Sequence, residues 1–322
     1  MSKTNTNLKT REILFIFDSR DCCPNGEREP GNEGPRIDSI SNRTLMTDAC
    51  FKRIIRDYFM YLDKAGNKIM VRQKLDYNDD DHIEMDEKFL NDLGVSESEL
   101  KDMDTNELES LITATFIDYR LFGSMFETSK SLIRRTGCVQ FEHSLSLNIP
   151  SLIQMSISSS MASESGKGAG ALGSTTILDY AIFATHAVMN ERLAKISGAT
   201  EEDASSLFKA IWDGVKALNT RTKFQMLPRG LIAIVPKDSR LKISGISSSI
   251  KLKEMNCKSF YECDLQLDAF VELVGQFADR IETIEYHLGP NFKFTIDGKE
   301  YDDLATALNS QNISVKLQKI NM

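Results

Sequence analysis

The sequence predicts an α+β protein with a ferredoxin-like core, in which helices cover an antiparallel sheet. Two observations predict this fold class. Short apolar runs of β-forming residues alternate with longer segments whose apolar residues recur at helical spacing. When two insertions are set aside, these segments follow the order strand, helix, strand, strand, helix, strand. The length of 322 residues suits about two domains, or one domain with large insertions.

The N-terminal part supplies the first strand and the first helix of this order. The apolar run at 12–17 predicts a buried strand, and 18–43, rich in Pro, Gly and Asn, predicts a long loop. Thr47 is placed to cap a helix whose apolar residues recur at helical spacing as far as Leu62. A further strand is expected at 68–73.

The two insertions differ in composition. Residues 76–109 carry fourteen acidic and two basic side chains, a net charge of −12, so the rest of this −8 chain has a charge of +4. We expect this acidic segment to be helical. Charge alone favours an ordinary solvated surface over a module held away from a polyanion. Residues 156–174 are rich in Ser, Gly and Ala, which predicts a mobile loop.

The remaining elements follow from the same patterns. Apolar stripes predict helices, and alternating or short apolar runs predict strands. In chain order we expect a helix over 108–123, a strand over 138–147, an extended segment over 176–189, a helix over 201–219, a strand over 231–235, a helix over 265–282, and short strands over 292–320 around a hairpin turn at Asp297-Gly298.

The first helix also carries the densest group of cations on a helix, which are Lys52, Arg53 and Arg56. Phosphate contact and a solvated helix face explain these three side chains equally well. Arg20, Arg36 and Arg43, in the preceding loop, add positive charge near the start of the same helix and favour phosphate contact.

The sequence predicts no metal site and no cofactor. The six cysteines include no C-x-x-C pair and the four histidines lie far apart, so a structural zinc site is not expected. Reduced thiols, a polar N-terminus and the lack of a long apolar stretch indicate a cytoplasmic protein without a membrane span.

Gly168, Gly170 and Gly173 match the letters of a dinucleotide-binding G-x-G-x-x-G motif. That motif needs a buried strand before it and a helix after it. Here polar residues precede the glycines and an extended segment follows them. We therefore interpret the segment as a flexible glycine loop that bears one cation, Lys167. A nucleotide-dependent oxidoreductase built on these glycines is kept as a less favoured hypothesis.

Seven stretches, in their order and spacing, resemble the repeated backbone subunit of type I CRISPR surveillance complexes (Cascade). The likeness is greatest to the type I-B branch of the DevR-type proteins of the RAMP superfamily. The stretches are 11–17 (REILFIF), 24–26 (PNG), 35–38 (PRID), 47–48 (TD) with 52–57 (KRIIRD), 118–123 (DYRLFG), 136–141 (TGCVQF) and 166–170 (GKGAG).

This resemblance implies a hand-shaped protein. Its palm, a modified RNA-recognition fold, comprises 11–75, 110–150 and 175–320. The acidic segment 76–109 belongs to helical fingers, and 150–175 forms a thumb that reaches the neighbouring copy and kinks the guide RNA. The RNA-binding candidates that the resemblance implies are Arg20, Asn25, Arg43, Lys52, Arg53, Arg56, Gln140, Phe141 and Lys167.

The function implied is that of a non-catalytic scaffold. It polymerises along crRNA and presents the guide for pairing with target DNA. Its expected partners are crRNA, neighbouring copies of itself, and the handle-capping, large and small Cascade subunits. The alternative is a metal-dependent RNA nuclease like the type III relatives, with Asp38 or Asp48 in a palm loop as the metal-binding acid.

Overall fold

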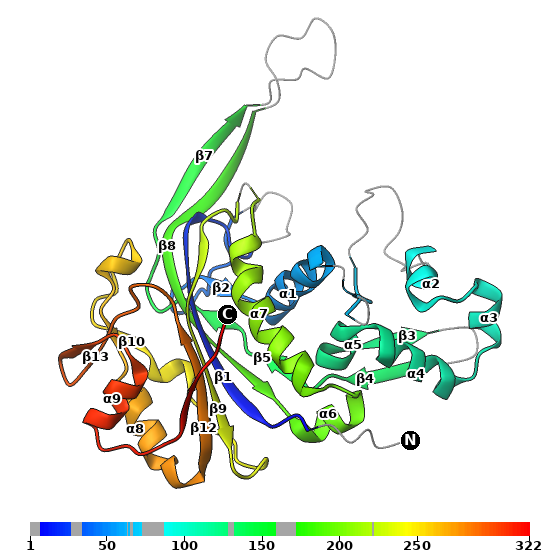
Figure 1. Ribbon diagram of the computed structural model, residues 1–322. Helices are drawn as coiled ribbons and strands as arrows, with labels where there is room; N and C mark the ends of the chain where they lie inside the picture. Colours follow the sequence, from blue (N-terminus) through cyan, green and yellow to red (C-terminus); the bar gives the residue numbers. More distant parts are fainter. Residues whose placement is uncertain are drawn as a thin grey trace, which may run out of the picture.

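A seven-stranded sheet forms the centre of the computed structural model, which describes residues 7–26, 34–62, 64, 67–72, 87–127, 132–158, 172–220 and 222–322 (Figure 1). Six strands lie side by side in the order β15-β12-β9-β1-β8-β5, and β7 pairs with β8. Their bounds are β1 Arg11–Cys22, β5 Val139–Phe141, β7 Leu152–Ser158, β8 Leu172–Met189, β9 Met226–Pro236, β12 Ile281–Leu288 and β15 Leu317–Lys319.

Four of these strands have the expected split βαβ arrangement. Along the chain β1 is followed by α1 (Asp48–Leu62), β5 and β8, and then by α7 (Glu201–Ala217) and β9. In the sheet the same strands lie in the order β9-β1-β8-β5, and every neighbouring pair is antiparallel. The predicted class, an antiparallel sheet with helices in an α+β protein, is therefore confirmed.

Both faces of β1 are covered, which explains its continuous apolar sequence. Phe15 and Phe17 pack on the side of α1 and α7, whereas Leu14 and Ile16 pack against the C-terminal segment on the other side (Figure 1). The ring of Phe17 stacks on that of Phe183, with the centroids 4.7 Å apart. Successive strand residues point to opposite faces, so the stretch 13–17, which is buried on both sides, is apolar at every position.

The C-terminal segment builds a second hydrophobic core against the sheet. Its small sheet has the strand order β10-β11-β13-β14. The turn at Asp297-Gly298 has positive φ at both residues, 49° and 73°, so the predicted hairpin is confirmed. The elements are η1 Ser247–Ser249, β10 Lys251–Leu252, η2 Phe260–Glu262, β11 Leu265–Gln266, α8 Asp268–Gln276, η3 Ala278–Arg280, β13 Phe294–Ile296, β14 Lys299–Tyr301 and α9 Leu304–Ser310.

A third, smaller core belongs to the segment that contains the acidic insertion. The predicted helices are present from residue 87 onward, and residues 76–86 lie outside the described part of the chain. Ser96 caps its helix in a capping box with Glu99. The elements are α2 Glu87–Leu93, α3 Glu97–Asp102, α4 Thr105–Thr115, α5 Ile117–Phe122, β3 Gly123–Glu127 and β4 Leu132–Thr136, and α6 Glu191–Ser197 packs beside them.

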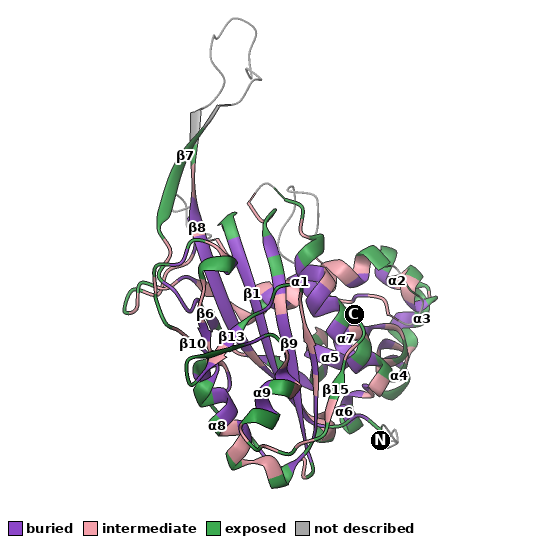
Figure 2. Ribbon diagram, turned by 60° about the vertical axis from the view of Figure 1, so that its left-hand side comes forward, coloured by how far each residue is buried: buried purple, intermediate pink, exposed green. Residues whose placement is uncertain are grey.

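A two-stranded ribbon of β7 and β8 projects beyond the body of the protein (Figures 1 and 2). The expected loop at 156–174 is therefore wrong at its ends, because 156–158 belong to β7 and 172–174 to β8. Leu152, Ile153 and Met155 are exposed on the ribbon.

Several boundaries in the N-terminal half differ from expectation. The loop expected at 18–43 is wrong at its start, because β8 and β9 pair with β1 as far as Cys22 and Ser19 respectively and extend the strand. Instead of a strand at 68–73, the described residues contain only a bridge from Lys68 to Phe116.

Two further predicted elements are divided. The helix expected over 108–123 is broken at Phe116, whose extended backbone separates α4 from α5. The strand expected over 138–147 divides into β5 and β6 (Ser144–Leu145), and β6 pairs with β2 (Leu45–Met46) instead of β8.

Two C-terminal predictions also need correction. The helix expected over 265–282 ends at Gln276, and from Ile281 the chain forms β12, which pairs with β9. The tail contains a helix, α9, where only strands were expected. In both places tertiary pairing and packing decide the local structure.

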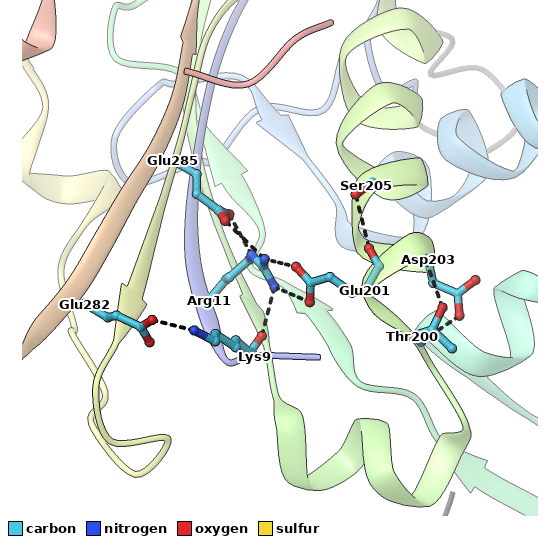
Figure 3. Close-up of polar contacts among 8 residues, drawn as sticks. All are labelled: Lys9, Arg11, Thr200, Glu201, Asp203, Ser205, Glu282 and Glu285. Atoms are coloured by element: carbon cyan, nitrogen blue, oxygen red, sulfur yellow. Dashed lines mark hydrogen bonds and ion pairs between the residues drawn. The ribbon is translucent and has the colours of Figure 1, made fainter. Parts of the chain in front are cut away.

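A buried arginine joins the sheet to α7 (Figure 3). The Arg11 Nε donates to Glu285 of β12 at 2.7 Å, and its terminal nitrogens contact Glu201, in the first turn of α7. The Arg11 Nη1 also donates to the Lys9 carbonyl oxygen at 3.2 Å. Arg11 is only 3% exposed, whereas the Glu201 side chain is 44% exposed, so these charge-assisted contacts link the buried start of β1 to the surface at the first turn of α7.

Candidate nucleic-acid interface

The start of α1 is held by a side chain from the preceding loop. The Asn25 Oδ1 accepts hydrogen bonds from the backbone N–H of Thr47 at 2.9 Å and from its hydroxyl at 2.8 Å. The Thr47 hydroxyl accepts in turn from the N–H of Cys50 at 3.3 Å, which makes Thr47 the expected N-cap. Asn25 is therefore occupied in positioning α1.

Lys52 and Gln140 are brought together by the fold. The Lys52 ammonium lies 3.2 Å from Asp48, one turn earlier on α1, and 3.2 Å from the Gln140 Oε1 on β5. It also lies 5.9 Å from the centroid of the Phe122 ring. The Lys52 side chain is 13% exposed, so its charge meets solvent only at the edge of the helix.

Arg56, whose side chain is about as exposed as that of Lys52, pairs with a buried carboxylate. Its Nε donates to Asp118 at 2.8 Å, and the Asp118 side chain is 0% exposed. The same carboxylate accepts from the backbone N–H groups of Met70 and Val71, at 2.8 and 3.1 Å. This arrangement assigns Arg56 to the framework, because the guanidinium neutralises a buried charge that also orders 70–71.

The other cations are more accessible. Arg53 pairs with Asp57 at 2.6 Å, and both side chains are about one-third exposed, at 34% and 40%. Arg20 lies on β1 and its side chain is 57% exposed, with Asp21 at 3.5 Å. In the described part of the chain the side chain of half-buried Arg43 has no hydrogen-bond or ion-pair partner. Exposed pairs of this kind are weak, so a phosphate can replace the carboxylate.

Phe141 belongs to the core. Its ring is 8% exposed and stacks on Phe51 of α1, with the centroids 5.3 Å apart. A base cannot stack on a ring whose faces are already covered, so the position of Phe141 argues against direct RNA contact. Lys167 lies outside the described residues.

Two residues that the sequence reasoning missed lie at the same end of α1. The His143 side chain is 63% exposed, and its Nδ1 accepts from the N–H of Asp48 at 3.3 Å. The Lys223 ammonium lies 3.8 Å from the Cys50 sulfur. His143 follows Gln140 by three residues, which is a weak local signal. Nothing local identifies Lys223, which is far from α1 in sequence. We call Lys52, Arg53, Gln140, His143 and Lys223 the α1 edge.

Gly123 and Gly137, which belong to the stretches 118–123 and 136–141, allow two backbone segments to approach closely. A Cβ on Gly137 would lie 2.2 Å from the Phe122 carbonyl carbon, and one on Gly123 would lie 2.2 Å from the Arg135 carbonyl oxygen. The two backbones therefore touch where α5 ends and β5 approaches. Arg120, in the first of these stretches, makes a bidentate ion pair with Asp203 of α7 at 2.8 and 2.9 Å.

The acids proposed for metal chemistry have other roles. Asp38 accepts from the N–H and hydroxyl of Ser41 at 2.9 and 2.5 Å, and these bonds lower the pKa of its carboxyl. Asp48 faces Lys52 and His143. Among the residues that the structure describes, no three His, Cys, Asp or Glu side chains gather in a way that would hold a metal ion.

The glycine motif also lacks its required context. β8 begins at Leu172, so the last glycine of the motif, Gly173, already lies in a strand where a dinucleotide site needs the start of a helix. Over the described ranges, no helix is both long and apolar enough to cross a bilayer.

The chain is similar to known proteins over most of its length. The model of a family described as CRISPR-associated protein Cas7 matches residues 9–268. A CRISPR-associated protein Cas7 from Haloferax volcanii is 26% identical over 311 residues, which covers 87% of this chain and 86% of that protein.

One solved structure shows a similar fold at low identity. A chain of a "CRISPR RNA-guided surveillance complex, pre-nicking" is 10% identical, with a TM-score of 0.50, and the match covers 94% of this chain and 98% of that one. A chain of another "CRISPR RNA-guided surveillance complex" is 15% identical, with a TM-score of 0.49 and the same coverage.

Proposed function

The chain belongs to the Cas7 family, and from this premise we propose that it binds crRNA as a backbone subunit of a type I CRISPR surveillance complex. The family match over residues 9–268 carries the proposal, since it includes α1, β5 and the strands that position them. The similarity of fold to a chain of an RNA-guided surveillance complex supports it.

The α1 edge supplies groups suited to the sugar-phosphate backbone. Lys52, Arg53 and Lys223 are cations, and Gln140 and His143 offer hydrogen bonds. Contacts to phosphates fix position without reading sequence. That property suits a protein whose guide varies, because base pairing with the target then supplies the specificity.

The remaining features of the proposal concern architecture. The split βαβ sheet, with α1 and α7, is the RNA-recognition-like palm (11–75, 110–150 and 175–320). The segment 76–109 belongs to the fingers, and the ribbon of β7 and β8 is the base of the thumb (150–175). Copies joined head to tail form an open helical filament along the guide RNA.

In this role the protein is a scaffold without catalytic activity. It presents the guide for pairing with target DNA, in the cytoplasm, together with neighbouring copies and the handle-capping, large and small subunits of a type I-B complex. Arg20 and Arg43 are further RNA contacts, as is Lys167 in the thumb. Asn25, Arg56 and Phe141 support the interface from within.

The proposal is tested by purifying the full-length chain, expressed with a CRISPR array. We expect large particles with a high 260/280 nm absorbance ratio that contain crRNA of uniform length. Affinity for RNA should fall steeply as salt rises, because each neutralised phosphate releases counterions. Particles that stay monomeric and free of RNA, although crRNA is supplied, would contradict it.

A further inference from the structure

Two cysteines of the C-terminal segment face each other across η2. The sulfur atoms of Cys257 and Cys263 lie 2.8 Å apart. The Cys263 thiol also lies 3.3 Å from the Ser259 carbonyl oxygen and 3.7 Å from the Tyr180 hydroxyl oxygen. Cys257 is 7% exposed and Cys263 is half-buried.

We propose that Cys257 and Cys263 are a reversible modification site, which forms an intramolecular disulfide when a peroxide is present. A disulfide bond is about 2.05 Å long, so the sulfurs need to approach by less than about 1 Å. The turn between them holds this geometry, through hydrogen bonds from the N–H of Glu262 to the Ser259 carbonyl at 3.1 Å and from that of Cys263 to the Phe260 carbonyl at 3.2 Å.

The reaction is a two-electron oxidation in two steps. The Cys257 thiolate attacks one peroxide oxygen, the O–O bond breaks, and the other oxygen leaves as hydroxide, which takes up the thiol proton and becomes water. The Cys263 sulfur then attacks the resulting sulfenic acid, the S–O bond breaks, and a second water leaves with the Cys263 proton. Two thiols are oxidised, and hydrogen peroxide is reduced to two waters.

The surroundings favour this pair over Cys23 and Cys138. The hydrogen bond from Cys263 lowers the pKa of Cys257, which favours the reactive thiolate. Burial has the opposite effect elsewhere, raising the pKa of Cys23 to about 11 and that of Cys138 to about 12. A raised pKa favours the protonated, less reactive thiol at these two positions.

The disulfide would fix a segment that touches the central sheet. The Phe260 ring, on η2, lies 4.3 Å from the Arg229 guanidinium. Arg229 makes a bidentate pair with Asp18 of β1, at 2.8 and 3.0 Å. Closing the ring of 257–263 removes freedom from the chain that carries Phe260, so the segment should open less often to solvent.

The experiment uses the tryptic map of the full chain. Trypsin cuts after Lys253, Lys258 and Arg280, so the two cysteines fall in different peptides, 254–258 and 259–280. The protein is treated with hydrogen peroxide, blocked with N-ethylmaleimide, digested and analysed by mass spectrometry. Controls are Cys257→Ser and Cys263→Ser, each of which removes one partner, and Cys50→Ser, which leaves the pair intact.

We expect a linked peptide pair, lighter by two hydrogens than the sum of its parts, that dithiothreitol separates. Its yield should rise at least about tenfold with peroxide in the wild-type protein and in Cys50→Ser, and it should be absent from the other two variants. Hydrogen exchange at 257–263 should slow in the oxidised form. Recovery of both peptides as maleimide adducts after peroxide, or of Cys263 linked to another cysteine, would overturn the proposal. None of these readouts depends on RNA.

Discussion

Arg56 of α1 and Asp118 of α5 form an ion pair in which a fully buried carboxylate lies 2.8 Å from the guanidinium Nε. The pair ties the first helix of the core to the segment that carries the acidic insertion. Neighbouring cations of α1 therefore have different roles. Arg56 neutralises a buried charge, whereas Arg53 pairs with Asp57 at the surface.

Arg56→Ala should destabilise the protein by about 3–5 kcal/mol, because it leaves the Asp118 charge buried without a cation. Arg53→Ala, the matched control on the same helix, should cost less than about 1 kcal/mol. Urea denaturation followed by circular dichroism measures both. Equal free energies of unfolding for the two variants would show that the Asp118 pair is not structural.

Replacing both Lys52 and Arg53 by Ala should weaken RNA binding by the same factor for unrelated guide sequences. Each lost phosphate contact should reduce the slope of log K against log salt by about 1. Arg240→Ala is the control, since Arg240 is an exposed, ion-paired cation outside the α1 edge. Filter binding over a range of salt measures the slopes. A loss that depends on guide sequence would indicate base reading instead.

Gly137→Ala should destabilise the protein by at least about 2–3 kcal/mol, since the new methyl group meets backbone atoms that cannot move independently. Gly94→Ala serves as the comparison. No atom lies within 4 Å of its would-be Cβ, so only the left-handed backbone, φ +71°, opposes it, at about 1–2 kcal/mol. Thermal melts of both variants should show the lower melting temperature for Gly137→Ala. Similar melting temperatures would contradict the close approach of Gly123 and Gly137.

Gln140 and Phe141 are adjacent in sequence and should behave in opposite ways. Phe141→Ala should cost about 3–5 kcal/mol of stability, because it empties a core position against Phe51. Gln140→Ala should leave stability within about 0.5 kcal/mol and weaken RNA binding. Paired unfolding and binding measurements separate the two effects. An unchanged stability for Phe141→Ala would place that ring outside the core.

Acid should destabilise the C-terminal segment through Asp303. Burial alone would raise the pKa of this carboxyl, but hydrogen bonds from the Thr306 N–H, Tyr286 and Lys319 lower it below 3.8. Burial raises the pKa of Tyr286 to about 12, so its hydroxyl remains a donor. A lowered pKa stabilises the folded state above the unfolded value, and the contribution disappears as the pH falls through the folded value.

Asp303→Asn keeps an N-cap for α9 but cannot titrate. Its free energy of unfolding should therefore fall less than that of the wild type between about pH 5 and pH 2. Urea denaturation at several pH values measures the difference. Parallel curves for the two proteins would show that Asp303 does not contribute.

Local patterns were sufficient for some elements and insufficient for others. The apolar run in β1, the stripes of α1 and α7 and the turn at Asp297-Gly298 were readable because each depends on neighbours in sequence. β12 was missed because its pairing with β9 decides its conformation. For the candidate site, spacing identified Lys52 and Arg53 as cations on one helix.

The sequence by itself determined the split βαβ order of the central strands and helices, the acidic insertion and the stretches shared with a family, since these reside in residue type and spacing. Only the tertiary structure decided which polar groups face inward. Arg56 pairs with the buried Asp118, Phe141 lies under α1, and Lys223 reaches Cys50 because chain segments distant in sequence meet there. A side chain's availability depends on what packs over it, and long-range packing is not encoded in any local pattern.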